Sequence, residues 1–324
     1  MNRVLVIRGG AIGDFILTLP AIKLLRDRFP RAHIEILGHT HITALAEKRF
    51  FADATRSIES GPLASFFARG SALPEDLVAY FHGFDLIVSY LFDPDGIFAT
   101  NLKRCRIGSF VAGPSKLNGG EHAALQLARP LEQMGLHLDN QAATIYPSEE
   151  DREFARDFLR GTAKPVIALH PGSGSKTKNW PIENWQKLGE HLFSAGHTLL
   201  VVAGEADEDR AQLLESAWRG KRARFAKHFT LPQLAGLFEN AFFLGHDSGI
   251  SHIAAAVGAR CLLLFGPTDP AVWAPANESV TVLQAPAGDM RLLTVDHVIA
   301  ALQPLLSLRP SVVIPSRVVG EGPL

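Results

Sequence analysis

The sequence has few cysteines, and this scarcity excludes two classes of small domain. Its 324 residues contain only two, Cys105 and Cys261, which lie far apart and outside any CxxC or Cys/His spacing. We therefore expect neither a disulfide framework nor a zinc site. We expect no other metal and no cofactor, and a location in the reducing cytoplasm.

The sequence also lacks a long apolar segment. The strand-like stretch Val4–Ile7 follows the first residues at once, with no apolar signal-peptide core before it. No run approaches the roughly 20 apolar residues of a membrane span. We expect a protein that is neither exported nor embedded in a membrane, with peripheral contact at the cytoplasmic face of the inner membrane as an open alternative.

An excess of charge of one sign is absent too. Lys and Arg total 32, Asp and Glu total 33, and the formal net charge is −1. Nucleic acid is therefore not an expected partner, although local charge can still hold an anionic small molecule. Hydrophobic residues make up 47% of the chain, which is enough to bury two cores.

Apolar strands, small-residue turns and helices alternate along the chain. The order begins with a strand over Arg3–Arg8, the turn Gly9–Gly13 and a helix over Phe15–Phe29. It restarts at Pro165–His170, after a helix start at Ser148. This alternation predicts an α/β fold of two Rossmann-like halves with parallel sheets.

We divide the chain into a first domain over 1–160, a second over 161–293 and a last segment over 294–324. The last helix should end ahead of Pro304. Three elements expected on the way are a strand over Cys105–Phe110, a helix over Glu121–Met134 and this last helix over Val295–Leu302.

The first turn places Asp14 at the start of a helix. Free backbone N–H groups at such a position favour negative charge, and the glycines before it allow close approach of a ligand. A carboxylate there is placed to accept a proton from an incoming hydroxyl. The alternative is that Asp14 only caps the helix.

The segment His170–Pro181 again leads from a strand into a helix. Its Gly and Ser residues expose N–H groups and hydroxyls, and Lys176 or Lys178 would supply positive charge to a diphosphate leaving group. Its spacing is not that of a Walker A loop. A solvated loop with two surface lysines is the alternative.

The segment Gly245–Ala256 joins a further strand to a helix rich in small residues. Asp247 and Ser248 begin this helix, and His252 lies on its first turn. The helix N-terminus and the imidazole could therefore contact the same anion. A structural histidine is the alternative.

Two other patterns are interpreted as structural. Asp93-Pro94-Asp95 has the form of a metal-binding DxD motif, but it follows a Rossmann-type strand and has no third ligand, so we expect a loop. The basic run from Arg219 to Lys227 is interpreted as a solvated face, with contact to anionic lipid as the alternative.

Several segments match, in order and spacing, the motifs of a known family. They are Val4–Arg8, Gly13-Asp14, Thr18–Ala21, His170–Gly172, Lys178–Pro181, Asp247–His252 and Leu264–Pro270. With them the chain resembles, over most of its length, the lipopolysaccharide heptosyltransferases of glycosyltransferase family 9. The resemblance implies the GT-B architecture, in which two Rossmann-like domains face each other across a cleft.

The resemblance also implies roles for individual residues. Asp14 is similar to the family's catalytic base, and Lys178 to the lysine that neutralises the departing diphosphate. Glu205 and Glu208, in an acidic stretch after Gly204, are chosen as the ribose-binding acids. The residues implied to bind the donor are Gly13, Ser173, Glu205, Glu208, Asp247, Ser248, Gly249 and His252.

The implied activity is an inverting, metal-independent transfer of a heptose or related sugar from an ADP-sugar to a lipopolysaccharide core or similar glycan. The first domain would bind the acceptor, the second the donor, and the last helix would return to the first domain. Candidate acceptor contacts are Lys103, Arg104 and Arg106, although no dense basic cluster is present.

Two other functions stay open. One is a different nucleotide-sugar enzyme on the same scaffold, such as an epimerase, because a fold does not fix a reaction. The other is a noncatalytic nucleotide-sugar-binding protein. A nicotinamide oxidoreductase is disfavoured because the first turn does not have the GxGxxG pattern of a dinucleotide site.

Overall fold

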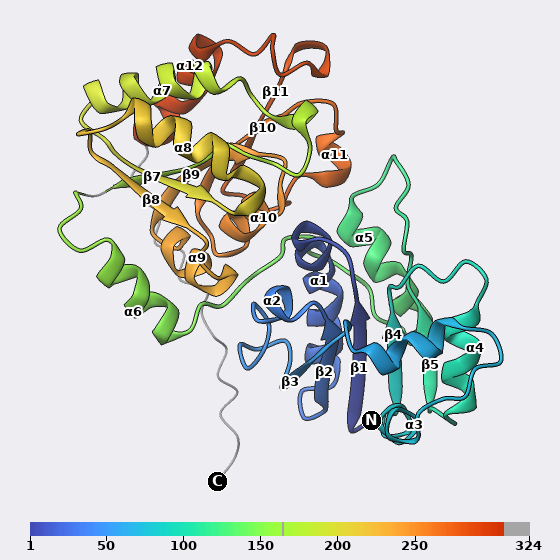
Figure 1. Cartoon of the computed structure of the whole chain (residues 1–324). Helices are drawn as coiled ribbons and strands as arrows, with labels where there is room; N and C mark the ends of the chain where they lie inside the picture. Colours follow the sequence, from blue (N-terminus) through green and yellow to red (C-terminus); the bar gives the residue numbers. More distant parts are fainter. Residues whose placement is uncertain (164, 308–324) are drawn as a thin grey trace.

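The structure contains two parallel β-sheets, each flanked by helices (Figure 1). It is a computed structural model and describes residues 1–163 and 165–307. The first sheet has the order β3-β2-β1-β4-β5, formed by β1 (Arg3–Arg8), β2 (His33–Gly38), β3 (Ala54–Ser57), β4 (Leu86–Ser89) and β5 (Ser109–Ala112). The second has the order β11-β10-β9-β6-β7-β8, formed by β6 (Val166–His170), β7 (Thr198–Ala203), β8 (Ala223–Lys227), β9 (Ala241–His246), β10 (Arg260–Phe265) and β11 (Val280–Gln284). The predicted α/β fold is confirmed.

Helices lie between the strands in both halves. Those up to residue 134 are α1 (Ile12–Arg28), α2 (Thr40–Thr43), η1 (Gly61–Phe67), α3 (Glu75–His82), α4 (Ile97–Arg104), α5 (Ala123–Ala128) and η2 (Arg129–Met134), where η marks a 3₁₀ helix. The later ones are α6 (Glu149–Phe158), η3 (Lys176–Lys178), α7 (Ile182–Ser194), η4 (Glu205–Asp207), α8 (Glu208–Ala217), α9 (Leu231–Phe238), α10 (Gly249–Ala256), α11 (Pro270–Trp273), η5 (Pro286–Gly288) and α12 (Val295–Ser307). Within the described residues, no helix combines the length and the apolar character that a membrane crossing requires.

The strand order places the three motif loops at the site where a ligand is expected. Winding of the chain reverses between β1 and β4 in the first sheet, and between β6 and β9 in the second. Loops that follow such neighbouring strands diverge and leave a crevice at the carboxyl edge of the sheet. The loops after β1, β6 and β9 are those that carry Asp14, Lys178 and Asp247.

Helix α6 packs with the second half of the molecule, although we placed it in the first domain. Phe154 and Phe158 contact Phe229, with ring centroids 5.1 and 5.0 Å apart. Arg152 donates two hydrogen bonds of 2.8 Å to Glu239, at the end of α9. This packing groups α6 with the second half. The sequence indicates where this helix starts but not which neighbour its apolar side covers.

Helix α12 also packs on the second half instead of returning to the first domain. Its buried residues Val298 and Leu302 lie in the same core cluster as Trp180 and Trp185. The helix continues through Pro304, where we expected its end, because Leu305 and Leu306 still pack against that core. The tail over 308–324 lies outside the described residues.

Three local predictions in the first domain meet different outcomes. The strand expected over Cys105–Phe110 begins only at Ser109, because α4 extends to Arg104. The single helix expected over Glu121–Met134 changes from α5 to η2 at Arg129, since Pro130 has no N–H to donate. The loop interpretation of Asp93 is confirmed, because its carboxylate accepts hydrogen bonds from two backbone amides at the start of α4.

The basic run from Arg219 to Lys227 is partly built into the fold. It contains the edge strand β8, which we did not predict. Arg224 donates hydrogen bonds of 3.0 Å to the carbonyls of Phe158 and Arg160. Lys227 pairs with Glu215 at 2.5 Å. The run alternates only weakly between apolar and polar residues, and most of its side chains are charged. We therefore interpreted it as a solvated face and did not predict strand β8.

Candidate active site

A cavity of about 450 Å³ lies between the carboxyl edges of the two sheets. Its lining comes from both halves of the chain. The first half contributes Gly10, Ala11, Ile12, Gly13, His39, His41, Ile42 and Glu59. The second contributes His170, Ser173, Gly174, Ala206, Asp207, Ser248, Gly249 and Ile250. This volume is in the usual range for a small-molecule site.

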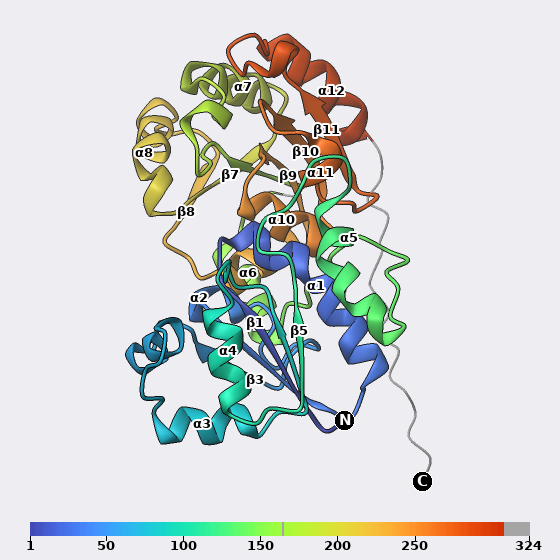
Figure 2. The ribbon, with the colours of Figure 1, turned by 90° about the vertical axis from the view of Figure 1, so that its right-hand side faces the viewer.

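The N-termini of α1 and α10 meet beside this cavity, as both views of the molecule show (Figures 1 and 2). A Cβ atom added to Gly249 would lie 2.6 Å from Cβ of Ile12 and 3.0 Å from the backbone nitrogen of Gly13. Gly249 is therefore required for this contact. Two helix N-termini directed at one cavity create positive potential there, which favours an anionic ligand.

Asp14 is the third residue of α1, and its side chain is 37% exposed. Oδ2 accepts a hydrogen bond of 2.9 Å from the amide of Ala11, so the carboxylate does help to cap the helix. Oδ1 lies 3.5 Å from Nη2 of the buried Arg8, which also donates to the carbonyl of Asp14. The capping role therefore leaves much of the carboxylate accessible to a substrate.

Lys178 and Asp247 form an ion pair. Nζ of Lys178 lies 2.6 Å from Oδ2 of Asp247, and Oγ1 of Thr268 donates to the same oxygen at 2.7 Å. Asp247 is buried. We expected Asp247 to belong to the diphosphate pocket. A carboxylate repels a phosphate, so its contact is with the lysine, which it holds in place.

His252 is buried beside Gly13 of the facing helix. Burial lowers the pKa of His252 to about 4, and the pKa responds also to the charges of Asp247, His122, Asp14 and Lys178. The fold therefore brings the predicted base, the predicted lysine and this histidine into one neighbourhood. His252 is neutral at pH 7, so it offers an anion a hydrogen bond rather than a charge.

A buried contact between His170, Asp207 and Ser248 was not predicted. Nε2 of His170 lies 3.1 Å from Oδ2 of Asp207, and Nδ1 lies 3.3 Å from Oγ of Ser248. Ser248 is the N-cap of α10, as its position predicts, and accepts from the amide of Ser251. All three side chains belong to cavity-lining residues.

Of the acids after Gly204, Asp207 lines the cavity, whereas Glu205 and Glu208 do not. Both glutamates are exposed, and Glu208 lies 3.4 Å from His228. Asp207 is therefore a third candidate for the ribose-binding acid, beside the Glu205 and Glu208 that we chose. The short η4 helix turns one acid inward and its neighbours outward, and a run of adjacent acids does not reveal that register.

The buried side chain of His246 forms hydrogen bonds to the loop after β6. The amide of Trp180 donates to Nε2 of His246 at 2.9 Å, so Nδ1 carries the proton and donates to the carbonyl of Gly172. Burial lowers the pKa of His246 to about 3. Ser173 lines the cavity, but its hydroxyl lies 2.8 Å from both the carbonyl of Ser175 and Oδ1 of Asn179, so it also shapes the loop.

Comparison with known proteins supports the family resemblance over most of the chain. The family model described as "Glycosyltransferase family 9 (heptosyltransferase)" matches residues 122–295. Lipopolysaccharide heptosyltransferase 3 of Escherichia coli is 24% identical over 325 residues, covering 92% of each protein.

Solved structures agree in fold. A family 9 glycosyl transferase from Veillonella parvula has a TM-score of 0.79 at 20% identity, covering 94% of this chain and 97% of that one. The heptosyltransferase WaaC of E. coli with ADP has a TM-score of 0.70 at 18% identity, covering 94% and 99%. The predicted GT-B architecture is confirmed.

We predict that Gly249→Ala weakens the contact between α1 and α10. The added methyl group cannot fit 2.6 Å from Ile12, so the free energy of unfolding should fall by about 1–3 kcal/mol, a usual cost of overpacking. Urea unfolding measures this. Gly174→Ala is the control, since Gly174 lines the same cavity but has open space at its Cβ position. Equal stability of the two variants would contradict the prediction.

We predict that His246 makes stability depend on pH. Native His246 stays neutral down to about pH 3, whereas the same side chain titrates near 6.5 when unfolded. The unfolded chain therefore binds more protons below pH 6.5, and the free energy of unfolding falls as the pH falls.

The free energy of unfolding should change with pH, and His246 should contribute about 1.4 kcal/mol per pH unit to this slope between about pH 6 and 5. Urea unfolding from pH 7 to 5 should give a smaller slope for His246→Gln than for wild type. His297→Gln, at an exposed position, is the control and should keep the wild-type slope. An unchanged slope in His246→Gln would contradict the prediction, because His246 would then bind protons equally in the native and unfolded states.

Proposed function

Because this chain belongs to glycosyltransferase family 9, the heptosyltransferase family, we propose that it transfers a heptose, or a related sugar, from an ADP-sugar to a lipopolysaccharide core or similar glycan. The observation that carries the proposal is the convergence of the three motif loops on one interdomain cavity. The names of its relatives support the substrate class, and WaaC of E. coli was solved with ADP.

The donor binds mainly to the second half in this proposal. Its diphosphate lies at the N-terminus of α10, where Ser248 and Gly249 line the cavity together with Ser173 and Gly174. Amides at a helix start are suited to phosphate oxygens. The carboxylate of Asp207 accepts hydrogen bonds from the ribose hydroxyls, as acids at this position in a Rossmann-like unit commonly do.

Asp14 acts as the general base. It removes the proton of the acceptor hydroxyl while the hydroxyl oxygen bonds to the anomeric carbon from the face opposite the diphosphate. The bond from that carbon to the phosphate oxygen breaks, so the configuration inverts and the nucleoside diphosphate leaves. The proton stays on Asp14 until solvent takes it.

Lys178 and the two helix N-termini stabilise the charge that develops on the leaving group. We assign this work to fixed protein charges and not to a metal ion. Asp247 holds Nζ of Lys178 at 2.6 Å before the donor arrives, so little reorganisation is needed in the reaction. His252 adds a neutral hydrogen-bonding group.

The acceptor approaches from the first half, where His39, His41 and Glu59 line the cavity. Nδ1 of His39 lies 3.3 Å from Oε1 of Glu59, and such groups suit sugar hydroxyls. Action in the cytoplasm, with peripheral contact at the inner membrane, is part of the proposal.

We predict that Asp14→Asn lowers turnover by about 10²–10⁴-fold, the usual contribution of a general base. The amide oxygen of Asn can still accept from Ala11, so helix α1 and donor affinity should be retained. Steady-state transfer and calorimetric donor binding measure the two quantities. Asp27→Asn, on the exposed side of the same helix, is the control. Activity within about tenfold of wild type would reject the assignment of the base.

We predict selective binding of ADP-heptose in calorimetric titrations with EDTA present. ADP should bind more weakly, and UDP-sugars and GDP-sugars should give no signal at the same concentrations. Selective binding of another nucleotide sugar would retain the fold and change the proposed donor. A requirement for added Mg²⁺ would contradict the proposed role of Lys178, and the absence of any binding would reject the donor site.

A further inference from the structure

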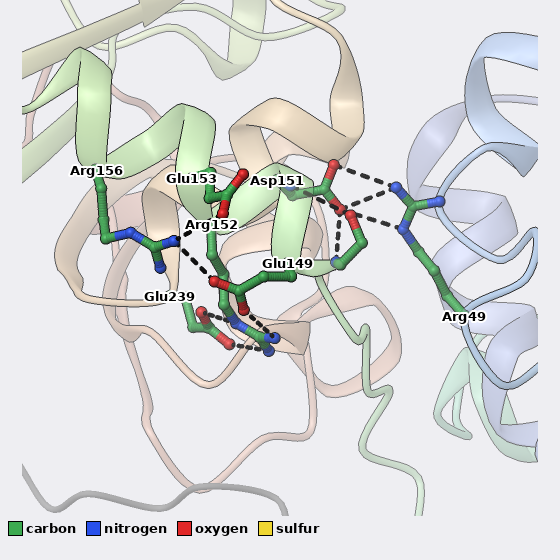
Figure 3. A network of polar contacts seen from close by, with 8 residues as sticks. Arg49, Glu149, Asp151, Arg152, Glu153, Arg156 and Glu239 are labelled. Atoms are coloured by element: carbon green, nitrogen blue, oxygen red, sulfur yellow. Dashed lines mark hydrogen bonds and ion pairs between the residues drawn. The ribbon is translucent and has the colours of Figure 1, made fainter.

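An ion pair between Arg49 and Asp151 joins the two halves of the molecule (Figure 3), and neither residue lines the cavity. Arg49 lies in the loop between α2 and β3, and Asp151 lies in the first turn of α6. Nη2 of Arg49 lies 2.9 Å from Oδ2 and 3.2 Å from Oδ1 of Asp151, and Nε lies 3.3 Å from Oδ2. The side chains are only 18% and 7% exposed, so the pair is poorly screened by solvent.

The same guanidinium holds the wall of the cavity. Nη1 of Arg49 donates to the carbonyl of Ala44 at 2.8 Å and to that of Glu47 at 3.2 Å. Ala44 directly follows α2, and His41 and Ile42 of α2 line the cavity. One side chain therefore ties the first-half wall of the cavity to α6.

The backbone around Arg49 is strained. Lys48 has φ 55° and Phe50 has φ 117°, although neither is glycine. Such conformations are unfavourable for residues with a Cβ atom and persist only where the surroundings enforce them. The amide of Lys48 donates to the carbonyl of Ala52 at 2.8 Å within this loop, and the ring centroid of Phe50 lies 5.4 Å from that of Tyr146, in the segment that leads into α6.

Asp151 is fixed to the second half. Its Oδ2 accepts from the amide of Ser148 at 2.7 Å, which caps α6. A Cβ atom added to Gly236 of α9 would lie 2.4 Å from the carbonyl oxygen of Asp151, so the two helices are in close contact. The distance between Arg49 and Asp151 therefore reports the separation between the cavity wall and the second half.

We propose that Arg49 is a positioning residue whose ion pair with Asp151 holds the first-half wall of the cavity at its donor-binding separation. Loss of the pair lets the halves separate without altering any residue that we assign to donor binding. The population of the closed form then falls, and the apparent affinity for the donor falls by the same factor.

The first test separates KM from kcat. Asp151→Asn keeps an oxygen acceptor for Ser148 but removes the charge that Arg49 pairs with. If the closed population falls to about a tenth, the donor KM rises about tenfold, while kcat at saturating donor stays within about twofold. Arg49→Ala should raise the donor KM by a similar factor. The double variant should raise it little further, because both substitutions remove the same interaction.

The matched control is Glu239→Gln. It removes a bidentate pair from the same helix α6, but Arg152 and Glu239 both belong to the second half. The donor KM of this variant should stay at the wild-type value. An equal rise in KM in both variants would overturn the proposal, because loss of α6 stability would then explain the effect.

The second test needs no donor. Spin labels on cysteines introduced at the exposed positions Arg28 of α1 and Lys187 of α7 report the distance between the halves by pulsed EPR. The native Cys105 and Cys261 are buried. We expect a longer and broader distance distribution in Asp151→Asn than in wild type or Glu239→Gln, and identical distributions would overturn the proposal.

The KM measurement rests on the proposed donor site, whereas the distance measurement does not. If no ADP-sugar binds but Asp151→Asn opens the molecule, the proposed function fails and the positioning role of the pair stands. If the donor binds to wild type while KM and the distance are both unchanged in the variant, the positioning role fails and the proposed function stands. If the distance between the halves increases in Asp151→Asn but the donor KM does not change, the proposal that the pair controls donor binding is also overturned.

Discussion

The structure depends on a contact that only glycine permits, between the N-termini of α1 and α10. Gly249 approaches Ile12 and Gly13 so closely that any side chain at position 249 would separate the helices. Each helix starts at a switch point of its own sheet, so this one contact brings the two crevices together. The cavity, its positive potential and the proximity of Asp14 to Lys178 all follow from it.

The charges at this contact are balanced inside the protein. Lys178 is paired with Asp247, Asp14 lies beside Arg8, and burial keeps His252 neutral. Positive potential for an anion therefore comes from helix termini, whose partial charges carry no desolvation cost comparable with that of a free buried cation. A diphosphate entering the cavity would meet a site that is already ordered, which favours electrostatic stabilisation without reorganisation.

The parts of the site that could be predicted from the sequence are those fixed by local rules. Buried strands have continuous apolar runs, so β1 and β6 and the loops after them were evident, and with them Asp14 and Lys178. Asp207 was missed because the register inside a short 3₁₀ turn depends on tertiary packing. The destinations of α6 and α12 were missed for a related reason, since an amphipathic helix does not specify which apolar surface it covers.

Further contacts limit how the halves can rotate about the glycine contact. Arg49 lies beside the edge strand β3 of the first sheet and bonds to Asp151, whereas His122 follows the opposite edge strand β5 and donates from Nε2 to the carbonyl of Ala274 at 2.8 Å. The glycine contact follows the central strand β1. Contacts at the centre and near both edges resist tilting in either direction. Because the Arg49 pair holds the wall that lines the cavity, a change at that edge alters the width of the site and leaves the catalytic groups unchanged.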